Sequence, residues 1–329
     1  MRLAVVMSVA LAYVGTVVGA GFASGQEIWQ FFSRFGPHGM IGIIISSAVF
    51  SMVGAIALEK GRHGITDFGH LLTNVYSPVM ARIGEGMTDV FLLLGLTVVV
   101  AGGGSTLASF HVNPWIGKIF TLGIILYVGY WGVEGITKAN SVIVPYLILI
   151  TLLTSLLSPS PSPLTLNIRQ PGAWLLSAVL YVSYNLFTAV MVLLGLGSKM
   201  HSSREAWYAA TLGGIILGLL LTLEHHVLVG LSHVNDLPML TVAYRINTHL
   251  GILYGASLWL ALLTTGIGIV FVFRERYGKR NLVLLWIVLA LTQWSFQALV
   301  KNLYPVMGSL AIMLWLPLFV SSRGADNRH

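Results

Sequence analysis

The sequence of 329 residues contains no cysteine and few charged side chains, which make up only 9% of it. Without cysteine there is no disulfide, no thiolate metal site and no cysteine nucleophile. Soluble domains carry about 25% charged residues, and a chain with far fewer cannot cover its surface with groups that water solvates well. Lipid must therefore cover much of the folded chain, and we expect an all-α integral membrane protein.

Hydrophobic residues make up 56% of the chain and occur in long runs. A helix needs roughly 20 apolar residues to cross a bilayer, and about ten such runs fit here. Residues 235–250 are mixed and polar, so we expect an interfacial helix there and not a span. The predicted spans 1 to 10 lie near residues 3–32, 40–58, 84–110, 114–132, 140–157, 171–197, 205–230, 251–273, 281–299 and 304–320.

Lysine and arginine are distributed unevenly over the loops between these spans. With Arg2 inside, most of the 18 lie on one side, and only Arg34, Lys118, Arg169, Arg245 and Lys301 lie on the other. Cytoplasmic loops carry the excess of positive charge, so we expect ten spans with both termini in the cytoplasm. No cleavage-type, transit or lipidation signal is evident, which favours a multi-pass protein of a prokaryotic plasma (inner) membrane.

The clear linker, Ser158-Pro-Ser-Pro-Ser-Pro163, cannot be helical and divides the chain in two. We expect a first five-helix repeat at 1–157, an extracytoplasmic linker at 158–170, a second five-helix repeat at 171–321 and a cytoplasmic tail at 322–329. Two five-span halves have opposite orientations. In transporters built this way the first helix of each half is often broken near the midplane, so we expect breaks in spans 1 and 6.

Glycines and polar residues mark the expected breaks. Span 1 contains Gly15-Thr-Val-Val-Gly-Ala-Gly-Phe-Ala-Ser-Gly25, and span 6 contains the polar cluster Tyr181-Val-Ser-Tyr-Asn-Leu-Phe187. The alternative for span 1 is close helix packing, because its glycines form two GxxxG pairs. Glu27 weakens that alternative, since a charged residue that deep in a membrane is usually functional.

The run Gly19-Ala-Gly-Phe-Ala-Ser-Gly-Gln-Glu27, with the arrangement in two halves, resembles the LeuT-type fold of the amino acid–polyamine–organocation (APC) superfamily. Within it, the run resembles the YkvI-like family, a group regarded as amino acid permeases. The resemblance implies a secondary active transporter that works by alternating access. It also implies a sodium ion, as coupling ion, between spans 1 and 8, held by Gly15, Val18, Ala261, Thr264 and Thr265.

Two threonines in a membrane helix have a simpler explanation, because their hydroxyls often bond the backbone of their own helix. Relatives that are proton-coupled use a lysine in the middle of span 5. Span 5 has no lysine there, which favours sodium.

The resemblance also implies a substrate site between spans 1 and 6. Its expected residues are Ala20, Gly21, Phe22, Ala23, Ser24, Val182, Ser183, Tyr184, Asn185 and Phe187. Backbone amides from Gly21 to Ser24 would take a carboxylate. Span 3 lacks the tyrosine that some amino acid carriers place near this site, so the expected substrate is an amino acid or a similar small solute.

Several ionisable residues lie within the predicted spans. We expect Glu27 to act as an outer gate with Arg34 or Lys301, or to lie on the cation path, or to form an interfacial salt bridge. Asp89 is expected to pair with a cytoplasmic base as part of an inner gate. Glu224-His-His226 could suggest a metal site or a proton relay. Adjacent histidines point about 100° apart on a helix, which makes them poor joint ligands.

Motifs of enzymes are missing from the chain: there is no HExxH and no GxSxG. We therefore expect no enzyme and no cofactor apart from the coupling ion. The expected partners are a small-molecule substrate and the lipid bilayer, with no nucleic acid and no obligate protein partner. The alternatives that stay open are a proton-coupled carrier of the same fold, a channel and a non-transporting homologue.

Overall fold

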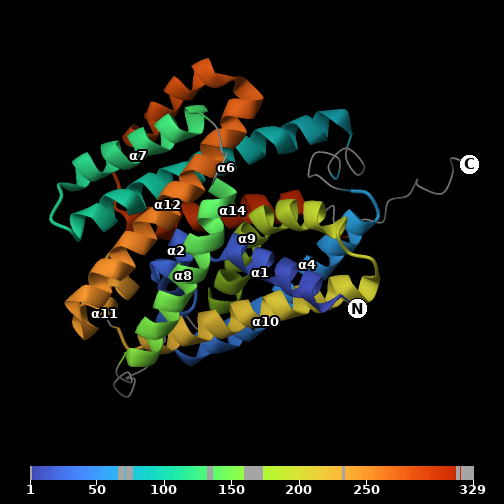
Figure 1. Ribbon diagram of the computed structural model, residues 1–329, viewed down its shortest axis with the longest axis horizontal. Coiled ribbons are helices and arrows are strands. Elements are labelled where there is room, and N and C mark those ends of the chain that lie inside the picture. Colours follow the sequence, from blue (N-terminus) through green and yellow to red (C-terminus); the bar gives the residue numbers. More distant parts are fainter. Residues whose placement is uncertain are drawn as a thin grey trace, which may run out of the picture.

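The computed structural model describes residues 2–65, 71, 77–131, 136–158, 173–231, 234–315 and 319. In this part of the chain helices follow one another with short connections (Figure 1). Apart from Ser158, the predicted linker at 158–170 lies outside the described residues, as does the predicted tail at 322–329.

The first half begins with α1, continues through three short helical segments and then contains long helices. The elements are α1 (Leu3–Val17), α2 (Ala20–Ala23), α3 (Gln26–Phe31), the 3₁₀ turn η1 (Ser33–Phe35), α4 (Pro37–Arg62), α6 (Pro78–Ala108), α7 (Pro114–Trp131) and α8 (Ile136–Leu157). The second half contains α9 (Ala173–Gly197), α10 (Ser203–Leu228), α11 (Pro238–Ile246), α12 (Thr248–Tyr277), the 3₁₀ segment η2 (Lys279–Ile287), α13 (Val288–Leu291) and α14 (Phe296–Trp315).

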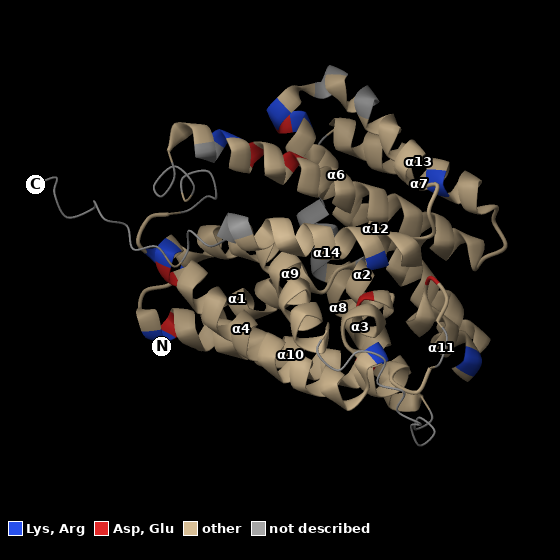
Figure 2. Cartoon of the chain, turned by 180° about the vertical axis from the view of Figure 1, so that it is seen from behind, with Lys and Arg blue, Asp and Glu red and all other residues tan. Residues whose placement is uncertain are grey.

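The long helices are built for lipid. Among the described residues, five helices are long and apolar enough to cross a membrane: α4, α6, α9, α10 and α12. Large apolar side chains such as Ile44, Trp115 and Leu219 face outward. Most lysines, arginines and acids lie toward the ends of the helices, and an acidic residue lies in the middle of the molecule beside α3 (Figure 2). The chain is therefore a multi-pass membrane protein.

The helices pack as two groups that are joined by further helices (Figure 1). The four-helix group consists of α1, α4, α9 and α10, in which α1 and α4 each contact both α9 and α10. The three-helix group consists of α6, α7 and α12. Helix α14 contacts α9 in one group and α6 in the other, and α8 contacts both α10 and α12. The junction between the groups surrounds the short segments α2 and α3.

Glycine allows α4 and α9 to touch through their backbones. A Cβ added at Gly61 would lie 2.1 Å from the carbonyl oxygen of Leu194, and one added at Gly197 would lie 2.4 Å from that of Leu58. Such contacts between small residues are how membrane helices approach closely, because lipid offers no hydrophobic drive for association.

The first span leaves the α-helix twice. Helix α1 ends at Val17, and the amide of Gly19 bonds the carbonyl of Val17 at 2.8 Å. The chain bends again at Gly25, whose φ of +78° favours glycine. A Cβ at Gly25 would also lie 2.5 Å from Cγ of Met239, and nothing lies within 4 Å of one added at Gly19. Gly19 therefore serves the interruption of the span and not a helix–helix contact, whereas Gly25 both turns the chain and lets α11 approach closely.

The predicted break in span 6 is wrong, because α9 is one continuous helix from Ala173 to Gly197. Its polar side chains bond carbonyls one turn earlier: Ser183 Oγ donates to Val179 at 2.6 Å, and Asn185 Nδ2 donates to Tyr181 at 3.0 Å. The cluster contains no glycine or proline, so nothing removes a backbone bond there.

The boundaries predicted for spans 9 and 10 are also wrong. Residues 281–299 are not one helix, since η2 and α13 end before a turn and α14 begins at Phe296. The start of α14 is fixed by acceptors for its free amides: Asp236 Oδ1 accepts from Gln297 N at 3.0 Å, and Ser295 Oγ accepts from Ala298 N at 3.2 Å. Pro305 lies inside α14 and does not mark the start of a span. The polar stretch predicted as an interfacial helix contains α11.

We predict that Gly61→Ala destabilises the fold by about 1–3 kcal/mol, because the new methyl group must push α4 away from the backbone of α9. Thermal unfolding in detergent measures the effect. Gly268→Ala in α12 is the control, since nothing lies within 4 Å of its new Cβ. Equal unfolding temperatures for the two variants would contradict the backbone contact.

Candidate functional site

A cavity of about 270 Å³ lies where the interrupted first span meets α6, α9, α12 and α14. Three kinds of residue line the cavity: residues 15–19 around the end of α1, Thr264 and Thr265 of α12, and the acidic Glu27. Some lining residues have polar side chains, and others are small or lie at the interruption of the first span, so that their backbone can reach the cavity. These are Gly15, Thr16, Val18, Gly19, Gly21, Glu27, Tyr184, Asn185, Thr188, Ala261, Thr264, Thr265 and Tyr304. The other lining side chains are mainly apolar, among them Phe91, Val98, Val99, Phe296 and Met307.

All five residues predicted to hold sodium line this one cavity, although they come from segments about 250 positions apart. Thr264 Oγ1 and Thr265 Oγ1 both donate to the carbonyl of Ala261, at 3.0 and 2.9 Å. Their hydroxyl protons are used in these bonds, and each oxygen keeps lone pairs for a cation. The Ala261 carbonyl accepts both hydroxyls, so it is free to bind an ion only when they turn away.

The end of α1 adds backbone oxygens to this wall. A helix leaves the carbonyls of its last turn without helical partners, and the turn at Val18 and Gly19 takes up only some of them: Val14 and Val17 accept from Val18 and Gly19. Oxygen ligands of this kind suit a hard cation.

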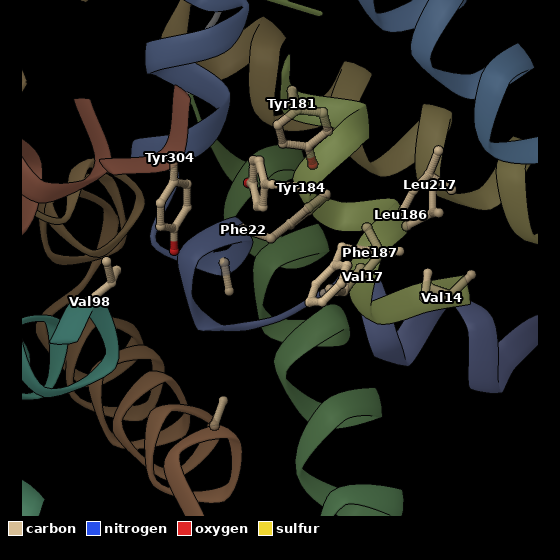
Figure 3. Packing of buried hydrophobic residues seen from close by; sticks show 14 of the residues in the cluster. Val14, Val17, Phe22, Val98, Tyr181, Tyr184, Leu186, Phe187, Leu217 and Tyr304 are labelled. Atoms are coloured by element: carbon tan, nitrogen blue, oxygen red, sulfur yellow. The ribbon is translucent and has the colours of Figure 1, made fainter. Parts of the chain in front are cut away.

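Glu27 places a carboxylate in the same cavity. The side chain is 4% exposed and accepts hydrogen bonds from the hydroxyls of Tyr184 in α9 and Tyr304 in α14. The two tyrosine rings lie 4.6 Å apart, beside the segment that carries Phe22 (Figure 3). A Cβ at Gly21 would lie 1.8 Å from Glu27 Oε1, so the carboxylate lies directly on the Gly21 backbone.

The position of Glu27 bears on the ion pairs predicted for it. The salt bridges of the described residues do not include Glu27, so it pairs with neither Arg34 nor Lys301. Its carboxylate points inward, to the cavity, where two tyrosines hold it. A place on the cation path stays a prediction, and the position of the carboxylate in the cavity is compatible with it.

Asp89 forms an ion pair, but within one helix group. Asp89 in α6 binds Arg276 Nη1 at 2.6 Å and accepts from the hydroxyl of Tyr277, both in α12. The predicted base partner is thus present. Because α6 and α12 both belong to the three-helix group, this pair fastens that group together and does not join the two groups as a gate would.

The predicted substrate residues divide between the cavity and the packed core. Gly21, Tyr184 and Asn185 line the cavity. A continuous helix turns only one face to the cavity, so α9 contributes Tyr184, Asn185 and Thr188, which lie on that face. Of the rest, Ser24 and Ser183 bond the backbone of their own segments, the side chain of Ala20 lies outside the description, and Phe22, Ala23, Val182 and Phe187 are buried in the apolar core.

Sequence analysis missed Tyr304, which holds Glu27. The prediction placed Tyr304 at the beginning of span 10, which puts it near the membrane surface. In the structure α14 begins eight residues earlier, which carries Tyr304 to the depth of the cavity. Thr188, Phe91 and Phe296 were missed as well; Phe91 contacts Phe187 with ring centroids 4.2 Å apart.

No protein-family model matches the chain. Two proteins of Bacillus subtilis (strain 168) are similar along nearly its whole length. One, described as the uncharacterized membrane protein YkvI, is 29% identical over 320 residues, covering 92% of this chain and 92% of that protein. The other, described as the uncharacterized protein YyaD, is 28% identical over 325 residues, covering 94% and 95%.

Solved structures of transporters have a similar fold. The Eremococcus coleocola manganese transporter, in complex with an aromatic bis-isothiourea compound, superimposes with a TM-score of 0.66 at 16% identity, covering 96% of this chain and 78% of that one. MhsT in complex with L-phenylalanine gives a TM-score of 0.60 at 18% identity, covering 96% and 88%. The chain therefore has the fold of these transporters.

We predict that single cysteines will map this cavity, because the natural chain has no cysteine to interfere. Thr188→Cys and Thr265→Cys line the cavity and should react with a small hydrophilic thiol reagent. Ser183→Cys and Ser257→Cys are matched controls on the same two helices, buried outside the lining, and should react at least tenfold more slowly. Similar labelling rates at all four positions would contradict the cavity described here.

Proposed function

We propose that the chain is a secondary active transporter that carries a small amine-bearing solute, with amino acids as the first candidates, together with sodium. The observation that carries the proposal is the single cavity in which the Thr264–Thr265 hydroxyls, the end of α1 and the Glu27 carboxylate meet. The fold supports it, since one similar structure is a manganese transporter and another holds L-phenylalanine. The expected location is a prokaryotic plasma membrane with both termini in the cytoplasm.

Sodium would bind between α1 and α12. The carbonyls of Gly15 and Val18 and the hydroxyls of Thr264 and Thr265 provide neutral oxygens on opposite walls of the cavity. A site without its own negative charge holds a monovalent ion weakly enough to release it again, as a transport cycle requires. Binding there would join the four-helix group to the three-helix group and so favour one conformation over another.

The solute would meet Glu27. We expected backbone amides from Gly21 to Ser24 to bind a solute carboxylate, but the Glu27 carboxylate lies on Gly21 in that place. A second carboxylate at the same position would be repelled, whereas an ammonium group would be attracted. The apolar wall at Phe91, Val99 and Phe296 would receive the rest of a small molecule.

Alternating access would follow from the position of the cavity between the groups. Tyr184 and Gly15 belong to the four-helix group and Thr264 to the three-helix group, so relative movement of the groups changes the site itself. If sodium and solute favour the same conformation, each raises the affinity of the other by the same factor.

Manganese is not favoured as the cargo. In the residues that the structure describes, no three side chains of His, Cys, Asp or Glu come together as a metal site. A proton-coupled carrier is the second candidate, because the threonine hydroxyls bond their own helix and Glu27 could exchange a proton in place of sodium.

We predict that the double variant Thr264→Ala and Thr265→Ala weakens the apparent affinity for sodium at least tenfold. The measurement is the rise in unfolding temperature as sodium chloride replaces choline chloride at constant ionic strength. Ser257→Ala is the matched control, since its hydroxyl also bonds the α12 backbone, at 2.6 Å, but does not line the cavity. Unchanged sodium stabilisation in the double variant would remove these threonines from the site.

We further predict that Glu27→Gln abolishes binding of the amine-bearing solute, because it removes the charge but keeps the shape. The readout is thermal stabilisation of purified protein by each of the common L-amino acids, and by N-acetylated forms of those that stabilise the natural chain. The natural chain should respond to the free amines alone. Equal stabilisation by the N-acetylated compounds, or by the same amino acids in the variant, would show that Glu27 does not bind the ammonium group.

A further inference from the structure

Helix α10 carries a second buried carboxylate that the cavity does not use. Glu224 is 0% exposed, and it is absent from the cavity lining. Neither of its carboxylate oxygens has a hydrogen-bond partner. No lysine or arginine among the described residues lies within ion-pair distance of it.

The surroundings of Glu224 make a negative charge unfavourable. Its electrostatic neighbours are Glu27 of α3, Tyr181 of α9 and Tyr254 of α12, none of which is a cation. The Tyr181 hydroxyl is itself buried without a partner, and the Tyr254 hydroxyl already donates to the carbonyl of Ala23 at 2.5 Å. His225, the next residue along α10, has its ring Nδ1 3.1 Å from Ser33 Oγ.

An ionised Glu224 carboxylate would have neither a hydrogen-bond partner nor an ion-pair partner among the described residues. Leaving a buried charge unpaired destabilises a protein by several kcal/mol. A negative charge on Glu27 would also repel one on Glu224. Glu27 accepts hydrogen bonds from two tyrosine hydroxyls, so it does not donate to Glu224. A protonated, neutral Glu224 avoids both the burial of an unpaired charge and the repulsion from Glu27.

Its place in the fold makes this proton exchangeable. Glu224 belongs to the four-helix group, while Tyr254 belongs to the three-helix group, and both lie at the junction around α2 and α3. Tyr254 reaches across the junction to the carbonyl of Ala23 at the end of α2. In the alternating-access movement proposed above, on which this step rests, separation of the groups would break this contact and let water reach the junction.

We infer that Glu224 is a proton-binding site, holding a proton as a neutral acid in the conformation described and exchanging it with water when the two helix groups part. The step forms and breaks only an O–H bond: the proton passes between the Glu224 carboxylate and a water molecule. The site is separate from the cavity and requires neither sodium nor solute to be bound there.

Infrared spectroscopy of the purified protein near neutral pH tests this site directly, because a protonated carboxyl has a C=O stretch apart from the amide and carboxylate bands. We expect this band in the natural protein and its loss in Glu224→Gln. Transfer to D₂O should move the band to lower frequency once the proton has exchanged. Glu224→Asp keeps an acid and should shift the band without removing it.

Glu205→Gln is the matched control on the same helix, because Glu205 is also buried but pairs with Arg2 at 2.9 Å and is ionised. Its band should equal that of the natural protein. The proposal is overturned if the natural protein lacks the band, if Glu224→Gln keeps it, or if it never moves in D₂O. These outcomes do not depend on transport, so they are separate from the tests of sodium and solute.

Discussion

The interruption of the first span, between Val17 and Gln26, is the constraint on which the rest of the structure depends. Inside a membrane, backbone that leaves the helix must find its hydrogen bonds within the protein or in a water-filled cavity. Here the surrounding helices provide them: Tyr254 donates to the carbonyl of Ala23 at 2.5 Å, and the amide of Met239 donates to that of Ser24 at 3.0 Å. Gly15 to Gly19 and Gly21 line the cavity. The segment that leaves the helix is therefore also part of the cavity wall.

The same interruption brings one carboxylate, Glu27, close to another, Glu224 of α10. Because α3 begins after Gly25, Glu27 folds back onto Gly21, where Tyr184 and Tyr304 hold it. Glu224 of α10 is an electrostatic neighbour of Glu27 and is buried without a hydrogen-bond partner. In the function proposed above Glu27 attracts a cation, and in the further inference Glu224 carries a proton. Sodium, an ammonium group and a proton would then act at one junction, and each would be sensitive to movement of the helix groups.

Much of this arrangement could be predicted from the sequence. Glycines 19 and 25 with Glu27 indicated an interrupted first span, and the resemblance to the LeuT-type fold implied that Ala261, Thr264 and Thr265 lie beside it; all three line the cavity. The break in span 6 was wrong because polar residues were taken as helix breakers, although Ser183 and Asn185 bond their own helix. Tyr304 was missed because the start of α14 depends on Asp236, a contact between distant segments that no local pattern reveals.

Transport into proteoliposomes tests the central claim most directly. The purified protein would be reconstituted with sodium outside and potassium inside, and uptake of radiolabelled L-amino acids would be followed, with a potassium exterior as the control. The account predicts that at least one free amino acid accumulates above its external concentration, and only while the sodium gradient lasts. Uptake that stops at equal concentrations, or that is the same with potassium outside, would contradict sodium-coupled transport.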